Sequence, residues 1–158
     1  MGVVVRPARS GEATTLTALC IRSKAHWAYD DAFMKLSAAA LAVDEADIAA
    51  GRVLVATVGQ GPALGMAAVL GDGETVDLDS LFVDPPAIGS GAGRLLFQAA
   101  TRMARDLGAR RMTILADPNA VSFYERMGAR FVRNAPSDAI PGRLLPLYEY
   151  DLTSGVDP

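Results

Sequence analysis

The sequence predicts an α/β (α+β) protein with a mixed, mostly antiparallel sheet of six or seven strands and about four helices, all in one domain over residues 1–158. Two observations predict this fold class. Strand-like and helix-like segments alternate along the chain, and three short strand candidates follow one another through turn signals. A chain of 158 residues can bury about two thirds of its unfolded surface, which is enough for one core.

The N-terminal half is predicted from capping and turn signals. VVVRPA indicates a first strand, and Ser10 with Glu12 opens a helix that runs to about Arg22. A second helical region is expected over residues 30–50, after the aromatic segment SKAHWAYDDAF. The turn signals GQGP and GDGE separate strands expected as an antiparallel meander over residues 52–58, 63–70 and 75–83.

The C-terminal half contains the clearest helix pattern, between Gly91 and Leu107. Gly108 follows where a helix C-terminal glycine belongs. After it we expect a strand at RRMTILAD, a short helix at NAVSFYERMG, and strands at ARFVR and LPLYEYDL. The apolar residues at spacings of three and four in the long helix are Leu95, Leu96, Ala99, Met103 and Leu107.

Composition excludes several classes of protein. A net charge of −3 without a Lys/Arg cluster argues against a nucleic-acid partner and suits a cationic small molecule better. No apolar run approaches the ~18 residues of a membrane span, and MGVVVRPARS does not fit a secretory signal. A cytoplasmic protein without a membrane partner is therefore expected. The lone cysteine, Cys20, is interpreted as a small core residue.

A glycine-rich run, VDPPAIGSGAGRLLF, precedes the long helix. A helix start offers unpaired N–H groups and a partial positive charge, and glycines let such a backbone approach a phosphate. The spacing does not match a Rossmann fingerprint, and Gly93-Arg94-Leu95 does not match a P-loop ending. From these residues alone, a flexible loop without a ligand remains an equal alternative.

The run does not stand alone. LFVDP, GSGAGRLLF and, about thirty residues later, DPNAVSFYERMGARF together resemble the GCN5-related N-acetyltransferase (GNAT) family over residues 75–131. The resemblance implies acetyl-CoA as co-substrate, no metal, and a strand that splays from its neighbour to receive the pantetheine arm while the glycine loop binds the pyrophosphate. The residues this implies for the cofactor are Leu81, Phe82, Val83, Ile88, Gly89, Ser90, Gly91, Ala92, Gly93, Arg94 and Asp117.

Three positions depart from the family pattern. Pro86 and Ile88 stand where the family usually has polar side chains, and Asp117 stands where many members have Asn. The main-chain amides and the helix dipole are then the principal phosphate donors, with Arg94 as a helper.

Acetyl transfer needs a neutral amine, a donor for the oxyanion and a group that protonates or stabilises the departing thiolate. The resemblance points to Tyr124 for the thiolate and to a backbone N–H near Leu81 or Phe82 for the oxyanion. An aromatic residue of a short helix is also commonly part of the core, so Tyr124 has that alternative.

The base has several candidates. On a regular strand Asp77, Asp79 and Leu81 share a face, and Asp77 matches by position the glutamate base of histone-acetylating relatives. Both aspartates also fit a solvated strand face that attracts a cationic amine. His26 is the only histidine, and it fits a base, a pocket wall or a packed residue next to Trp27.

In the resembled fold, the segment between the first two helices forms one wall of the acceptor site. Here that segment supplies His26, Trp27 and Tyr29 as expected substrate-binding residues, with a hydrophobic plug as the alternative for Trp27. The sequence thus predicts an acetyl-CoA-dependent N-acetyltransferase that acetylates a primary amine of a small molecule or peptide in a ternary complex. The alternative is an inactive acyl-CoA-binding sensor. The segment IPGRLLPLYEYDL fits either a strand that pairs across a homodimer or an edge strand of a monomer.

Overall fold

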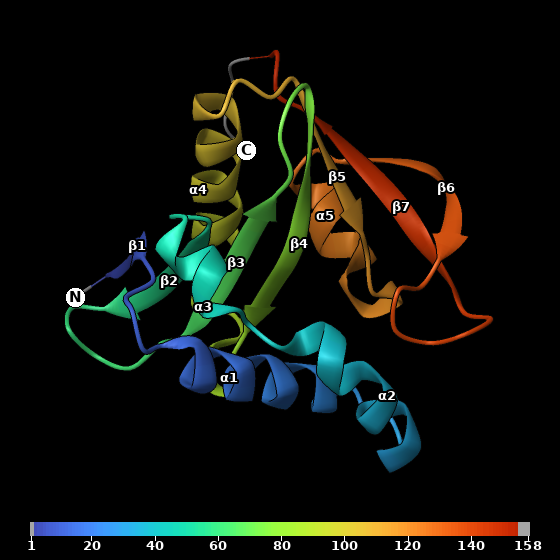
Figure 1. The fold of residues 1–158 in the computed structure, drawn as a ribbon, viewed down its shortest axis with the longest axis horizontal. Coiled ribbons are helices and arrows are strands. Elements are labelled where there is room, and N and C mark those ends of the chain that lie inside the picture. Colours follow the sequence, from blue (N-terminus) through green and yellow to red (C-terminus); the bar gives the residue numbers. More distant parts are fainter. Residues whose placement is uncertain (1, 155–158) are drawn as a thin grey trace.

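The computed structural model describes residues 2–154 and contains a seven-stranded sheet (Figure 1). The strand order is β1-β2-β3-β4-β5-β7-β6. Neighbouring strands are antiparallel except for β4 and β5, which are parallel, so the predicted mixed, mostly antiparallel sheet is confirmed. The strands are β1 (Val3–Pro7), β2 (Val53–Val58), β3 (Gly65–Leu70), β4 (Thr75–Val83), β5 (Arg111–Leu115), β6 (Arg130–Pro136) and β7 (Leu144–Asp151).

Helices lie on both faces of the sheet (Figure 1). On one face α4 packs against β1 to β4, and on the other α1 packs against β3, β4 and α2. Short 3-10 helices, η1 and η2, precede α4 and α5 respectively. The α-helices and 3-10 helices are α1 (Ala13–Ala25), α2 (Asp31–Leu41), α3 (Glu45–Ala49), η1 (Pro85–Ala87), α4 (Ala92–Asp106), η2 (Pro118–Ala120) and α5 (Val121–Arg126).

The helical region expected over residues 30–50 is two helices rather than one. The chain leaves the helical conformation at Ala42, and the Asp44 carboxylate then accepts a hydrogen bond of 2.8 Å from the Ala46 N–H. An aspartate in this N-cap position satisfies an amide that has no partner inside the helix. The cap therefore starts a new helix at Glu45.

The sheet separates two clusters of buried apolar side chains. Phe97 and Leu96 of α4 pack with Val76, Leu78 and Met112 on one face. On the other face Leu16, Leu19 and Cys20 of α1 pack with β2 and β3, and Cys20 is 1% exposed. The interpretation of Cys20 as a core residue is confirmed, and burial raises the pKa of its thiol to about 12.

A β-bulge interrupts β4 and corrects one prediction about faces. Ser80 pairs with Ala68 and Leu78 with Val69, so Asp79 is an extra residue in the ladder. Because a bulge shifts the alternation of side chains, Leu81 packs on the same side as Leu78. The expectation that Leu81 shares a face with Asp77 and Asp79 was wrong for this reason.

The sheet opens between its two central strands. β4 and β5 pair only at Thr75 to Asp77 with Arg111 to Thr113, and beyond these residues the two strands have no ladder between them. β4 continues to Val83 in contact with β3 alone. The predicted divergence of the strand before the glycine run is therefore present in the fold.

The C-terminal strand β7 lies inside the sheet, between β5 and β6. Both of its edges are paired within the chain, so β6 rather than β7 is the edge strand on this side. A homodimer stays a prediction, but not one that uses β7 as its pairing edge. Among residues 2–154, no helix is both long and apolar enough to cross a membrane.

Candidate active site

A cavity of about 930 Å³ occupies the gap between β4 and β5. Its walls come from β4, the glycine-rich loop, the start of α4, the end of β5 and helix α5, with part of α1 beside them. Most of the predicted site residues line it: Leu81, Phe82, Val83, Ile88, Gly89, Gly91, Ala92, Gly93, Arg94, Asp117, Tyr124, Asp79 and Trp27. Four predicted residues, Ser90, Asp77, His26 and Tyr29, are not part of its wall.

The glycine-rich loop offers main-chain donors to this cavity. Within residues 2–154 the amides of Gly89, Gly91, Gly93 and Arg94 have no hydrogen-bond acceptor. The Ser90 amide is used inside the loop, where it donates to the carbonyl of Ala87 at 3.0 Å. The free N–H groups stand at the N-terminus of the 15-residue helix α4, where the helix dipole favours an anion.

Gly91 and Gly93 of this run are glycine for two different structural reasons. Gly91 has φ +90° and ψ −1°, a left-handed conformation that residues with a Cβ adopt only with strain. Gly93 has ordinary helical geometry, but a Cβ there would lie 3.3 Å from the Phe123 ring. Gly91 therefore shapes the loop, whereas Gly93 lets α4 pack closely against α5.

Tyr124 lies on α5 and is 6% exposed. Its ring packs against Phe123 and Phe97, with centroid separations of 5.2 and 6.2 Å, while the residue also lines the cavity. Within the described residues no hydrogen bond uses its hydroxyl. Burial, followed by the charges of Asp117 and Asp77, raises the pKa of this hydroxyl well above its ordinary value, so it stays protonated at neutral pH. Tyr124 is thus both a core residue and an available proton donor.

Asp77 and Asp79 differ in their surroundings. Asp77 does not line the cavity and accepts a hydrogen bond of 2.9 Å from the Thr113 hydroxyl. Burial raises its pKa despite that hydrogen bond, and Asp79 and Asp138 raise it further. Asp79 is an exposed residue that lines the cavity, and partial burial of its carboxyl group, followed by the charges of Asp47 and Asp138, raises its pKa as well. Of the two, only Asp79 lines the cavity.

The three aromatic residues after α1 have three different environments. Trp27 lines the cavity and is 47% exposed, which contradicts the hydrophobic plug. His26 is the C-cap of α1 and is exposed, with its ring 5.0 Å from that of Trp27. Tyr29 points toward Asp117 and donates a hydrogen bond of 2.8 Å to it. Only Trp27 is placed to contact a ligand in the cavity.

Two further residues at the site were missed by sequence reasoning. Lys24 lines the cavity and forms an ion pair of 2.6 Å with Asp117, and Arg143 donates a hydrogen bond of 3.1 Å to the Tyr29 hydroxyl. Lys24 is the only cation in the aromatic segment SKAHWAYDDAF, which is a signal that could have singled it out. Arg143 carries no such signal, because it is separated from Tyr29 by 114 residues.

The fold and the site together define a class of protein. In this class the central parallel strands of a mixed sheet diverge around a cavity, and a helix N-terminus with free amides beside that cavity can bind an anion. The family model for the acetyltransferase (GNAT) domain matches residues 9–138. The chain therefore belongs to the GNAT family and is an N-acetyltransferase. A comparison with curated proteins finds no match.

Solved structures share this fold. A GCN5-related N-acetyltransferase from Rhodopseudomonas palustris, also named aminotransferase class-II, is 25% identical, with a TM-score of 0.76 and 96% of each chain covered. The PaiA N-acetyltransferase from Thermoplasma acidophilum, in complex with coenzyme A, has a TM-score of 0.76 at 13% identity, covering 96% of this chain and 99% of that one. YncA from Salmonella typhimurium, a putative acetyltransferase with acetyl-CoA, has a TM-score of 0.68 at 22% identity, covering 100% and 98%.

Proposed function

We propose that this N-acetyltransferase transfers the acetyl group of acetyl-CoA to a primary amine of a small molecule or peptide, by direct attack of the amine in a ternary complex. The observation that carries the proposal is the cavity between β4 and β5, which brings three functional groups into one space. These are the free amides of the glycine-rich loop, the uncommitted hydroxyl of Tyr124 and the carboxylate of Asp79.

The walls of the cavity fit acetyl-CoA in two places. The loop amides at Gly89 and Gly91 offer donors for the pyrophosphate, in a position where the helix dipole adds a favourable field. The edge of β4 beyond Asp77 has no partner on the β5 side and offers main-chain groups to the pantetheine amides. The neighbours solved with coenzyme A and with acetyl-CoA support this assignment.

Each reacting group has a residue suited to it. Tyr124, which stays protonated, donates a hydrogen bond or its proton to the departing CoA thiolate. A backbone N–H near Leu81 or Phe82 stabilises the oxyanion. The acceptor's ammonium loses one proton to Asp79, whose pKa is raised, and then attacks as the neutral amine; Asp77, through an intervening water, is the alternative acceptor of that proton.

The acceptor is expected to be cationic before it loses its proton. Among residues 2–154, neither Asp77 nor Asp79 forms an ion pair, whereas Lys24 is already paired with Asp117. A protonated amine would therefore meet negative charge on the β4 side of the cavity.

A thiol-release assay with a panel of amines tests the proposal. The panel contains polyamines, amino-acid amides, aminosugars and lysine peptides, each with its N-acetylated form as the matched control. We expect at least one free amine to release CoA thiol and to gain the mass of one acetyl group, while its acetylated control does neither. Tight binding of acetyl-CoA with no transfer to any amine would contradict the proposal and favour the acyl-CoA sensor.

A further inference from the structure

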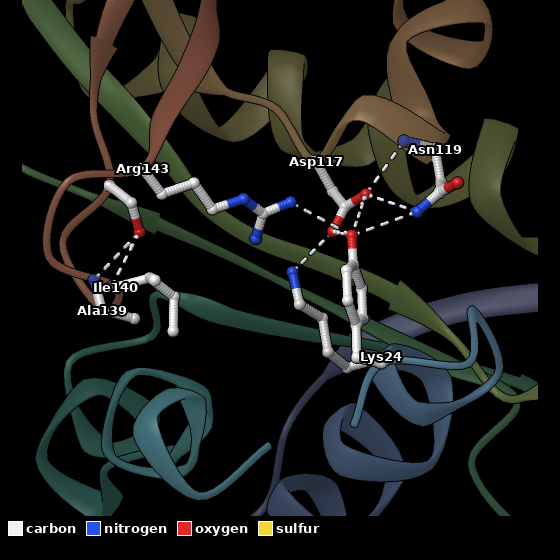
Figure 2. Close-up of polar contacts among 8 residues, drawn as sticks. Lys24, Asp117, Asn119, Ala139, Ile140 and Arg143 are labelled. Carbon is white, nitrogen blue, oxygen red and sulfur yellow. Dashed lines mark hydrogen bonds and ion pairs between the residues drawn. The ribbon is translucent and has the colours of Figure 1, made fainter. Parts of the chain in front are cut away.

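Asp117 joins the end of α1 and the α1–α2 connection to a part of the chain about ninety residues further on (Figure 2). Its carboxylate accepts hydrogen bonds from Lys24 Nζ at 2.6 Å, from the Tyr29 hydroxyl at 2.8 Å and from both the amide and the side chain of Asn119 at 2.9 Å. Lys24 belongs to the last turn of α1, Tyr29 to the α1–α2 segment and Asn119 to η2. The Asp117 carboxylate thus joins the end of α1 and the α1–α2 segment to the wall of the cavity.

The β6–β7 connection reaches the same point. Arg143 donates a hydrogen bond of 3.1 Å to the Tyr29 hydroxyl (Figure 2). Its guanidinium also lies 5.3 Å from the Tyr29 ring centroid and 4.8 Å from that of Phe33, which stacks on Tyr29 at 4.0 Å. Tyr29 is therefore held at its hydroxyl and on its ring.

The ion pair at the centre of this network is sheltered from solvent. The side chains of Lys24 and Asp117 are 13% and 17% exposed. Burial alone would raise the pKa of Asp117, but the hydrogen bonds from Lys24 and Asn119 outweigh it and lower the pKa. Removing either partner leaves a sheltered charge without its counterpart, which costs far more than the loss of an exposed pair.

We propose that Asp117 is a positioning residue: its contacts with Lys24 and Tyr29 hold the α1–α2 segment so that Trp27 forms the acceptor side of the cavity. The geometry supports this because Lys24, Trp27 and Asp117 all line the cavity, while Tyr29 reaches Asp117 from outside it. The effect on acceptor binding rests on the proposed function. The effect on the segment itself does not.

Trp27 is the only tryptophan in the chain, so its fluorescence reports on this segment without a label. The test variants are Asp117→Asn, which keeps the size of the side chain but removes its charge, and Lys24→Met. The matched control is Glu12→Gln, which alters the Arg6–Glu12 ion pair at the opposite end of α1, with side chains 22% and 24% exposed. Melting curves establish that each variant is folded.

We expect Asp117→Asn and Lys24→Met to increase acrylamide quenching of Trp27, and Glu12→Gln to leave it unchanged. With an acceptor found in the amine panel, both test variants should raise the acceptor KM by about fivefold or more, with little change in the Kd of acetyl-CoA. The double variant should raise KM no further than either single one, because both act through one ion pair.

Unchanged quenching in a folded Asp117→Asn variant would overturn the proposal. Weaker acetyl-CoA binding with unchanged quenching would also overturn it, because Asp117 would then be a cofactor ligand. If no amine is acetylated by the wild-type protein, the proposed function fails, but the quenching experiment still decides whether Asp117 positions the segment.

Discussion

Replacement of Gly91 by alanine tests the role of the glycine-rich loop. Gly91 has φ +90°, and a Cβ built there meets no atom within 4 Å. The cost of the substitution in the free protein is therefore backbone strain alone, about 1–2 kcal/mol for an L-residue in the left-handed region. For a chain of this length that lowers the melting temperature by about 2–8 °C.

We also expect Gly91→Ala to weaken the binding of coenzyme A, by more free energy than the strain costs in stability. Relaxation of residue 91 toward negative φ turns its N–H, and those beside it, away from the pyrophosphate. Loss of one hydrogen bond to a charged group costs about 1.5–3 kcal/mol, which corresponds to about 10- to 150-fold weaker binding. Isothermal titration calorimetry with coenzyme A measures this difference.

Gly108 supplies a matched control at the other end of the same helix. It has φ +86°, and a Cβ there also meets nothing within 4 Å. Gly108→Ala should lower the melting temperature by a similar amount and leave the Kd of coenzyme A unchanged. Equal affinities in the two variants would refute the reasoning, because strain alone would then explain both and the loop would have no special role in binding.

Three further predictions follow from the site and from α1. Trp27→Ala should change the melting temperature little, because the side chain is 47% exposed, and should raise the acceptor KM; a loss of ~3 kcal/mol in the free energy of unfolding would instead indicate a buried plug. Asp79→Asn should lower kcat/KM and flatten the acidic limb of its pH profile. In the wild type kcat/KM should fall as Asp79 becomes protonated, at a pH above the ordinary aspartate pKa of 3.8. An unchanged pH profile would exclude Asp79 as the base. The Arg6 hydrogen bonds lower the pKa of Glu12 from 4.5 to about 2, so the stability it contributes is present above pH 4.5 and is lost toward pH 2; the melting temperatures of wild type and Glu12→Gln should converge over that window.

Features set by local signals were predictable from the sequence. The turns GQGP and GDGE predicted the meander of β2 to β4, and the glycine run with Gly108 predicted α4 to within one or two residues. The same pattern was less accurate for burial within α4. Phe97 is fully buried but was not in the predicted apolar stripe, and Leu107, which was, is 40% exposed.

Features set by distant parts of the chain were not predictable. The bulge at Asp79 depends on the register with β3, and it moves Leu81 to the opposite face from the one that strict alternation gives. The ion pair between Lys24 and Asp117 joins residues 93 apart in the sequence. The sequence singled out Asp117 as a cofactor-binding residue and as a departure from the family pattern, but not its contacts with Lys24 and Tyr29, which depend on how α1 packs.

The comparison of wild type with Tyr124→Phe in acetyl transfer tests the central claim most directly. The substitution keeps the ring that packs against Phe97 and Phe123 and removes only the hydroxyl of this cavity-lining residue. With saturating acetyl-CoA and amine, and with chemistry limiting the rate, we predict a fall in kcat of ~100-fold or more and an unchanged Kd of acetyl-CoA. Equal kcat values for the two proteins would contradict the assignment of Tyr124 as the donor to the leaving thiolate, and with it the proposed chemistry of the cavity.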